Sequence, residues 1–191
     1  MKVVFGGAFN PITKAHMDVY HYLKERLDFN EFIFLPVSSA YTKSELASNY
    51  HRLNMLEIVT KDYPDIEVSK LEIDDSDFLG TYQSLIRLYD KKEDDLYFVV
   101  GADNLFKMHK WINIKGILSE FKVVILGRNN LNIEELIKER EVLNQYRQSF
   151  LIFEDFKRDI SSTTFRETLN NEDVEDEVYQ YIEENQLYGV K

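Results

Sequence analysis

The chain has 191 residues, of which 44% are hydrophobic and 14% aromatic, so it is long enough to bury a substantial core and too apolar for a disordered protein. It contains no cysteine, which excludes a disulfide framework, a thiolate metal site and a cysteine nucleophile. The formal net charge of −11 argues against nucleic acid and anionic membranes as partners. The sequence has no apolar run that could span a bilayer and no signal-peptide pattern, so we expect a cytoplasmic protein.

The first expected elements are a strand, a glycine turn and a helix. Lys2–Phe5 is an apolar run typical of a buried strand, Gly6-Gly7 follows it, and an amphipathic stretch continues to about Leu27. Glycines let the backbone approach a ligand closely, and a helix start presents unpaired N–H groups to it. Thr13 and His16 are three residues apart, so they face the same side of the first turn. The stretch predicts a phosphate site, although an ordinary glycine turn and a surface histidine would give the same pattern.

Apolar runs and helical patterns alternate along the rest of the chain. Strands are expected at 31–37, 66–71, 96–100, 121–127 and 150–153. Helices are expected at 51–60, 81–89, 133–146, 162–169 and 174–185, with a loop at 38–49. This alternation predicts an α/β fold: a single Rossmann-like, doubly wound domain over residues 1–191, with a mostly parallel sheet of about five to six strands and helices on both faces. Ligands of such folds bind beyond the carboxyl ends of the strands.

One candidate site follows the buried strand 96–100. Gly101 ends that strand, Asp103 follows at the start of a helix, and Trp111 is the single tryptophan of the chain. Asp103 could be a simple N-cap, and for a lone tryptophan a place in the core is the better interpretation.

A further candidate lies in the C-terminal helical segment, residues 161–191. Ser161, Ser162 and Thr163 place hydroxyl groups at the start of a helix, and Arg166 follows one turn later. Hydroxyl and N–H groups donate to phosphate oxygens while arginine supplies charge, so the pattern predicts a phosphate cradle. The alternative is a helix N-cap formed by Ser161 or Ser162.

The first and last of these motifs resemble the two signatures of the nucleotidyltransferase superfamily that contains the small-molecule adenylyl- and cytidylyltransferases. Residues 6–16 resemble Gly-Gly/Ser-x-Phe-Asn/Asp-Pro followed by His/Thr-x-Gly-His, except that Ala15 replaces a glycine. Residues 160–166 match Ile-Ser-Ser-Thr-x-x-Arg at every fixed position. The resemblance implies catalytic roles for Thr13, His16 and Arg166. It also implies that the ATP phosphates and ribose contact Gly6, Gly7, Ala8, Phe9, Lys14, Gly101, Asp103, Ile160, Ser161, Ser162 and Thr163.

The middle motif resembles that of the nicotinate-nucleotide adenylyltransferases. In that family the aspartate of a Gly-x-Asp…Trp stretch holds a ribose hydroxyl and the tryptophan stacks on the pyridine ring, which implies these roles for Asp103 and Trp111. By the same resemblance, Thr81 and backbone N–H groups near Ile112 would bind the nicotinate nucleotide. Lys43 resembles the loop lysine of the family and is equally compatible with a solvated side chain.

The match is weaker elsewhere in the chain. Gln83 and Ser84 depart from the family's Thr-x-Asp-Thr-Leu pattern, and Arg52 with Met55 resembles its Arg-x-x-Met helix.

The resemblance implies transfer of AMP from ATP to nicotinate mononucleotide by direct in-line attack, with release of pyrophosphate. His16 would act at the α- and β-phosphates, while Arg166, Ser161 and Ser162 would hold the pyrophosphate. Mg²⁺ is expected mainly through ATP oxygens and water, so no metal-binding residues are assigned. The oligomeric state stays open, a homo-oligomer included.

Several alternatives share parts of this pattern. The phosphate acceptor could instead be nicotinamide mononucleotide, phosphopantetheine or another small phosphate. A tRNA-charging catalytic domain is set aside because the chain is short, acidic and without a Lys-x-Ser-Lys loop. A nucleotide-binding sensor without turnover is the non-enzymatic alternative.

Overall fold

The computed structural model describes residues 1–39, 46–75, 77, 79–89, 95–128, 131–156, 158 and 161–190. The chain divides into two compact units. The first comprises Met1–Gly6 and Phe78–Arg158, and the second comprises Gly7–Asp77 and Asp159–Lys191. The candidate motifs 7–16 and 161–166 therefore belong to the same unit, whereas the motif 101–111 belongs to the other.

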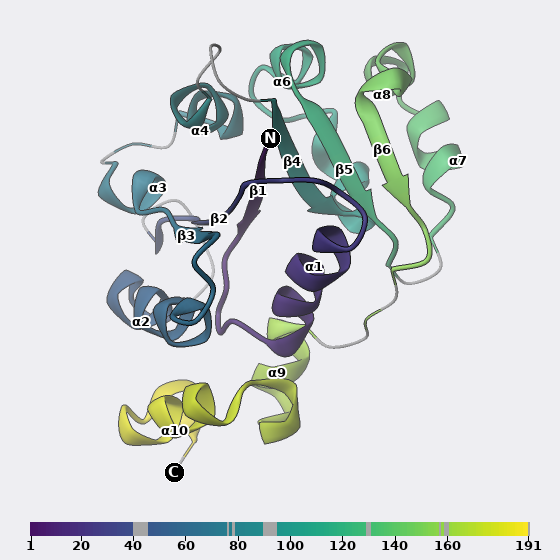
Figure 1. The fold of residues 1–191 in the computed structure, drawn as a ribbon. Helices are drawn as coiled ribbons and strands as arrows, with labels where there is room; N and C mark the ends of the chain where they lie inside the picture. Colours follow the sequence, from purple (N-terminus) through teal and green to yellow (C-terminus); the bar gives the residue numbers. More distant parts are fainter. Residues whose placement is uncertain are drawn as a thin grey trace. The chain divides into compact units, whose positions relative to one another are not determined.

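The first unit is built on four parallel strands. Their order is β1 (Lys2–Gly7), β4 (Leu96–Gly101), β5 (Lys122–Leu126) and β6 (Phe150–Phe153). The register pairs Val4 with Phe98 and Ile125 with Ile152, and Figure 1 shows β4, β5 and β6 side by side. The valine and isoleucine side chains of β1, β4 and β5 are buried, as expected for parallel strands covered on both faces. Since the strands are parallel, their carboxyl ends share one edge of this unit.

Short helices connect these strands. They are α4 (Thr81–Leu88), the 3₁₀ turn η2 (Ala102–Asn104), α5 (Leu105–Met108), α6 (Ile114–Glu120), α7 (Ile133–Lys138), α8 (Glu141–Gln145) and the 3₁₀ turn η3 (Arg147–Ser149). Figure 1 shows α7 and α8 next to β6. Helix α6, which the sequence analysis did not expect, is capped by Asn113, whose Oδ1 accepts from Gly116 N at 3.3 Å.

The second unit combines a parallel strand pair with helices from both ends of the chain. Its elements are α1 (Lys14–Lys24), β2 (Glu31–Pro36), α2 (Asn49–Thr60), β3 (Ile66–Val68), α3 (Leu71–Asp74), α9 (Ser162–Thr168), the 3₁₀ turn η4 (Asn171–Asp173), α10 (Asp176–Glu184) and the 3₁₀ turn η5 (Leu187–Gly189). Strand β2 pairs with β3, and α2 packs against both β3 and α10. The tyrosine hydroxyl of Tyr181 joins α10 to α2 by hydrogen bonds with His51 Nδ1 (2.9 Å) and Asn54 Nδ2 (2.8 Å).

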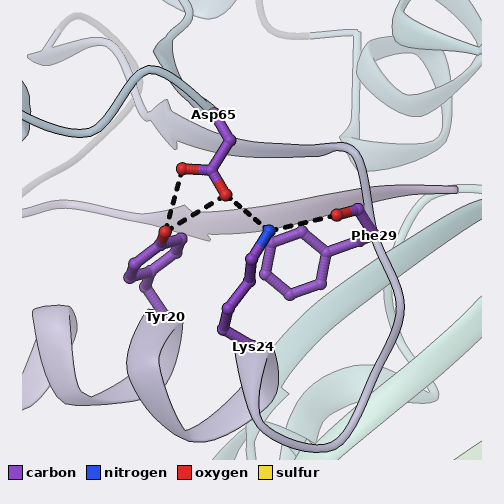
Figure 2. Close-up of polar contacts among 4 residues, drawn as sticks. All are labelled: Tyr20, Lys24, Phe29 and Asp65. Atoms are coloured by element: carbon purple, nitrogen blue, oxygen red, sulfur yellow. Dashed lines mark hydrogen bonds and ion pairs between the residues drawn. The ribbon is translucent and has the colours of Figure 1, made fainter.

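The C-terminal end of α1 is tied to the start of β3 by a polar network (Figure 2). Tyr20 Oη donates to both carboxylate oxygens of Asp65 at 2.9 and 3.1 Å. Lys24 Nζ donates to Asp65 Oδ2 at 2.7 Å and to Phe29 O at 3.3 Å, and it lies 4.5 Å from the Phe29 ring centroid. Asp65 precedes the first residue of β3, so the network fixes α1 against this strand.

The network shifts the pKa values of its members. Burial, followed by the hydrogen bond to Asp65, raises the pKa of Tyr20 to about 12. Burial also acts to raise the pKa of Asp65, but hydrogen bonds from Lys24 and Tyr20 outweigh it and hold that pKa below its ordinary value.

The predicted α/β class is confirmed, since the described residues form six strands, every pair whose register is described is parallel, and helices separate them. The single-domain assignment stays a prediction. In the described part of the chain, no helix has the length and apolar character needed to cross a membrane.

The boundary of one predicted strand was wrong. The strand expected at 66–71 ends at Val68, because Ser69 Oγ accepts from Leu71 N (3.3 Å) and turns the chain into α3.

One predicted helix was also wrong, since the segment 133–146 is two helices. A continuous helix would rotate Leu143 by about 240° from Ile137, away from the core face. The break at Glu139–Arg140 lets both apolar side chains be fully buried.

Candidate active site

The loop that follows β1 has a fixed conformation in the second unit. Phe9 has a φ of +46°, an uncommon value for a residue with a side chain, and its ring is buried edge-to-face against Phe34 and His16 at centroid distances of 5.3 and 5.2 Å. A Cβ at Gly7 would lie 3.1 Å from the Phe9 ring, a tight contact that glycine avoids. Ala8 is half-buried, and the Asn10–Pro11 peptide bond is cis. The burial of Phe9 thus fixes the path of the backbone at residues 7–10.

Thr13 and His16 form a hydrogen-bonded pair at the start of α1. Thr13 N donates to His16 Nδ1 at 3.0 Å, and Thr13 Oγ1 lies 2.8 Å from the same nitrogen. Because a backbone N–H can only donate, Nδ1 is the unprotonated nitrogen and the neutral ring carries its proton on Nε2. Thr13 is 2% exposed and His16 is half-buried. Thr13 therefore orients the imidazole and fixes which nitrogen of the ring is a donor.

The C-terminal motif contacts the opening loop directly. Ser162 Oγ donates to Pro11 O at 2.8 Å, between residues 151 positions apart in the chain. Arg166 Nη1 donates to Asn10 O at 2.6 Å, and Arg166 Nη2 donates to Thr163 Oγ1 at 3.3 Å. Arg166 is exposed and has five N–H donors in a planar fork, so it retains donors for an anion. The structure thus brings together the two phosphate motifs that the sequence predicted separately.

Ser161 has the structural role that was the alternative interpretation. Its hydroxyl caps α9, accepting from Thr164 N at 3.0 Å, and also lies 2.9 Å from Thr164 Oγ1.

A fully buried arginine holds the opening loop by hydrogen bonds to backbone carbonyl groups. Arg52, on α2, is 0% exposed and donates to Ala8 O (2.7 Å), Val37 O (2.7 Å), Asn49 Oδ1 (2.6 Å) and Ala47 O (3.2 Å). Among the residues that the structure describes, its partners are neutral acceptors and no carboxylate pairs with it. Burial lowers the pKa of Arg52 from its ordinary value.

Arg52 had no predicted role. A signal was present, because Arg52 shares a helical face with Met55 and Leu56, both 0% exposed, and a charge on an apolar face is an anomaly.

The middle motif lies in the first unit, at the carboxyl end of β4. The Asp103 carboxylate folds back over Gly101, where an added Cβ would lie 2.6 Å from Asp103 Oδ1. A Cβ at Gly101 would therefore require the Asp103 side chain to move. Asp103 is exposed, and its Oδ1 lies 3.7 Å from Arg128 Nη1, which follows β5.

Thr81, Trp111 and Ile112 come from two segments that approach each other in this unit. Trp111 is half-buried and packs edge-to-face on Phe98 at 6.2 Å, so one part of the indole remains accessible. Ile112 is 59% exposed and lies against Gly80, where an added Cβ would be 2.9 Å from Ile112 Cβ. Gly80 has a φ of +91° and caps the helix that Thr81 begins. The structure thus places Thr81 and Ile112 on either side of one glycine.

Two of the remaining predicted site residues, Gly6 and Lys14, are among the described residues. Gly6 ends the part of β1 that belongs to the first unit, where an added Cβ would lie 3.2 Å from the Phe98 ring. Lys14 is half-buried as the first residue of α1. Lys43 and Ile160 lie outside the described residues. Over the described ranges, no group of three or more histidine or acidic side chains is arranged to hold a metal ion.

Comparison with known proteins identifies relatives over nearly the whole chain. The chain matches the family described as cytidylyltransferase-like over residues 4–168. A protein of Acholeplasma laidlawii named "Probable nicotinate-nucleotide adenylyltransferase" is 34% identical over 191 residues, covering 98% of this chain and 97% of that protein. A protein of the same name from Clostridium acetobutylicum is 31% identical over 196 residues, covering 98% of each.

Solved structures have the same fold. The nicotinic acid mononucleotide adenylyltransferase of Plasmodium falciparum complexed with NaAD gives a TM-score of 0.76 at 20% identity, over 100% of this chain and 98% of that chain. The same protein complexed with APC gives a TM-score of 0.75 over the same shares. At this identity the likeness establishes the fold, a Rossmann-like α/β architecture with a parallel sheet flanked by helices.

Proposed function

The chain belongs to the cytidylyltransferase-like family, a family of nucleotidyltransferases, and from this premise we propose that it transfers the AMP moiety of ATP to nicotinate mononucleotide. The products are nicotinate adenine dinucleotide and pyrophosphate, as in the biosynthesis of NAD. One observation carries the proposal. Ser162 and Arg166 donate to the carbonyl groups of Pro11 and Asn10, and this contact between the two segments supports a common site for them in the second unit.

The reaction needs no nucleophile from the protein. An oxygen of the acceptor phosphate, which is already ionised, attacks the α-phosphorus of ATP. The new P–O bond forms as the bond from the α-phosphorus to the bridging oxygen of the β-phosphate breaks, and pyrophosphate leaves with that electron pair. The enzyme's task is to position the reactants and to neutralise the charge that develops.

We assign the α- and β-phosphates to the opening loop and the start of α1. The His16 ring carries its proton on Nε2, because Thr13 N donates to Nδ1, so Nε2–H is a donor for a phosphate oxygen. Gly7 and Ala8 contribute backbone N–H groups, and Gly6, Phe9 and Lys14 complete the predicted contacts.

We assign the departing pyrophosphate to the exposed guanidinium of Arg166. Two of its N–H groups are held by Asn10 O and Thr163 Oγ1, which fixes the fork while leaving donors for an anion. Ile160, Ser161 and Ser162 remain part of this proposed contact set.

The nicotinate nucleotide is assigned to the first unit. The half-buried indole of Trp111 offers a surface for stacking of the pyridine ring, and the exposed Asp103 carboxylate offers acceptors for ribose hydroxyls. Thr81, Ile112 and Lys43 complete this set.

Mg²⁺ belongs to the proposal as a partner of ATP. Phosphate oxygens and water would supply most of its ligands. When bound, the ion neutralises charge on the triphosphate. The proposal also includes a cytoplasmic location, no nucleic-acid partner and an open oligomeric state, a homo-oligomer included.

The test is release of pyrophosphate from ATP and Mg²⁺ with three separate acceptors: nicotinate mononucleotide, nicotinamide mononucleotide and phosphopantetheine. The proposal expects fast release with the first and formation of an equal amount of the dinucleotide. Preference for either of the other acceptors would reject the substrate assignment. ATP binding without turnover on any of the three would favour the sensor alternative instead.

A further inference from the structure

Asn10 connects the opening loop to three separate segments of the second unit. Its side chain is 1% exposed, and Oδ1 accepts from Ala47 N at 3.0 Å and from Tyr188 Oη at 2.9 Å. Its backbone oxygen accepts from Arg166 Nη1 at 2.6 Å. Ala47 N can only donate, which fixes the orientation of the Asn10 amide and makes the Tyr188 hydroxyl the donor. The loop is therefore held by the C-terminal end of the chain.

Tyr188 adopts an unfavourable backbone conformation at this position. Its φ is +56°, in the left-handed region that costs energy for a residue with a Cβ, and it lies in η5, near the end of the chain. Its ring packs edge-to-face on Phe165 at 6.0 Å. A strained residue persists only where its surroundings determine it, and here the surroundings are the ring contact and the bond to Asn10.

The hydroxyl of Tyr188 lies in a cationic environment. Burial raises the pKa of Tyr188, while the nearby guanidinium groups of Arg52 and Arg166 act in the opposite direction. Arg52 donates to Ala8 O and Arg166 donates to Asn10 O, so both cations hold the same loop. The Tyr188–Asn10 bond adds a neutral contact to a loop that two charged side chains already hold by its backbone.

We infer that Tyr188 is a positioning residue for the ATP triphosphate, acting through Asn10 on the loop of residues 7–10. This inference rests on the proposed function, which assigns the phosphates to this loop. Tyr188 touches no reacting atom. Its hydroxyl keeps Asn10 in place, and Asn10 keeps the neighbouring N–H groups aimed at the phosphates.

The chain offers a matched control for removal of this hydroxyl. Tyr181, also in the C-terminal segment, uses its hydroxyl to bind His51 and Asn54 on α2 and makes no described contact with the loop. The variants Tyr188→Phe and Tyr181→Phe each delete one hydroxyl and keep the ring. Their effects on stability are therefore comparable, and only the first should change the use of ATP.

The experiment measures steady-state kinetics of both variants with MgATP and nicotinate mononucleotide, MgATP binding by calorimetry, and thermal melting. For Tyr188→Phe we expect the KM and Kd of MgATP to rise roughly three- to tenfold, the effect of one buried hydrogen bond, with an unchanged KM for nicotinate mononucleotide. For Tyr181→Phe all these constants should equal those of the wild type.

Equal Kd and KM values for MgATP in Tyr188→Phe and the wild type would overturn the inference, as would the same change in both variants. A purely structural role would lower the melting temperature and leave these constants unchanged. If the wild type binds MgATP but transfers no AMP, the proposed function fails, and the MgATP Kd of the two variants still decides the inference.

Discussion

The two ends of helix α1 use polar side chains in different ways. At the C-terminal end, Tyr20 and Lys24 both donate to Asp65, and the network ties the helix to β3. At the N-terminal end, the N–H and the hydroxyl of Thr13 both contact His16 Nδ1. These contacts leave the proton of the imidazole on Nε2, so that Nε2–H is a donor. The first arrangement matches each donor with an acceptor in the protein and stabilises the fold. The second, in the proposed function, presents a donor to the ATP phosphates. Changes at one end should therefore affect stability, and changes at the other should affect rate.

The largest effect is expected for His16→Ala. Loss of a donor aimed at a developing phosphate charge should lower kcat roughly 10²–10³-fold, with little change in melting temperature. The measurement is kcat for AMP transfer together with a thermal melt. His21→Ala, which removes an exposed histidine further along the same helix, is the control and should keep wild-type kcat. A normal kcat in folded His16→Ala would remove His16 from the chemistry.

Asp65→Asn should have the largest effect on stability. The substitution removes the charge that Lys24 pairs with and weakens the acceptor of Tyr20. We expect the free energy of unfolding to fall by about 1–3 kcal/mol, and the melting temperature to fall by about 2–4 °C for each kcal/mol. The kinetic constants should not change. Asp62→Asn, at an exposed carboxylate just before it, is the control. If Asp65→Asn altered the KM of ATP at a temperature where it is folded, the separation of the two ends would be wrong.

The same network predicts how stability depends on pH. The folded-state pKa of Asp65 lies below its unfolded value of about 3.9, so its contribution is present above that pH and is lost as the pH falls through the folded pKa. The pKa of Tyr20 is raised to about 12, so its contribution is complete below about pH 10 and is lost as the pH rises through the folded value. Denaturant unfolding across this range should show both losses in the wild type. Asp65→Asn should lack the acid one, and a wild-type acid slope in that variant would contradict this assignment.

Lys24→Met should have the smallest effect. The lysine side chain is 43% exposed, so its ion pair is screened by solvent, and methionine keeps the aliphatic contact with Phe29. We expect a loss of about 1 kcal/mol or less, measured by denaturant unfolding, and no change in turnover. A loss as large as that of Asp65→Asn would mean that the charge pair, and not the Tyr20 hydrogen bond, dominates the network.

The sequence predicted the parts of the molecule that local patterns encode. The buried strand and glycine turn at residues 2–7 and the hydroxyl-rich helix start at 161–163 are visible in a single segment each. Their contact is not, because the Ser162–Pro11 bond joins residues 151 positions apart. The Tyr20–Asp65 and Tyr188–Asn10 bonds were missed for the same reason.

Errors in the predicted elements arose where tertiary packing overrode the local pattern. The charged segment 133–146 has helical composition throughout, but burial of Leu143 requires a break after Lys138. In the candidate site, the burial of Arg52 is likewise determined by tertiary contacts and not by the local sequence. A charged residue usually indicates a solvated surface. The backbone carbonyl groups and the Asn49 amide oxygen that accept from Arg52 explain its complete burial.

The most direct test of direct AMP transfer at the N-terminal end of α1 follows the fate of the α-phosphate in a single turnover. Wild type and His16→Ala are each mixed with nicotinate mononucleotide, Mg²⁺ and ATP radiolabelled at the α-phosphate. The account predicts that the label passes into nicotinate adenine dinucleotide without appearing on the protein, and that His16→Ala slows this passage roughly 10²-fold or more while still binding ATP. Label recovered on the protein, or an unchanged rate in His16→Ala, would contradict it.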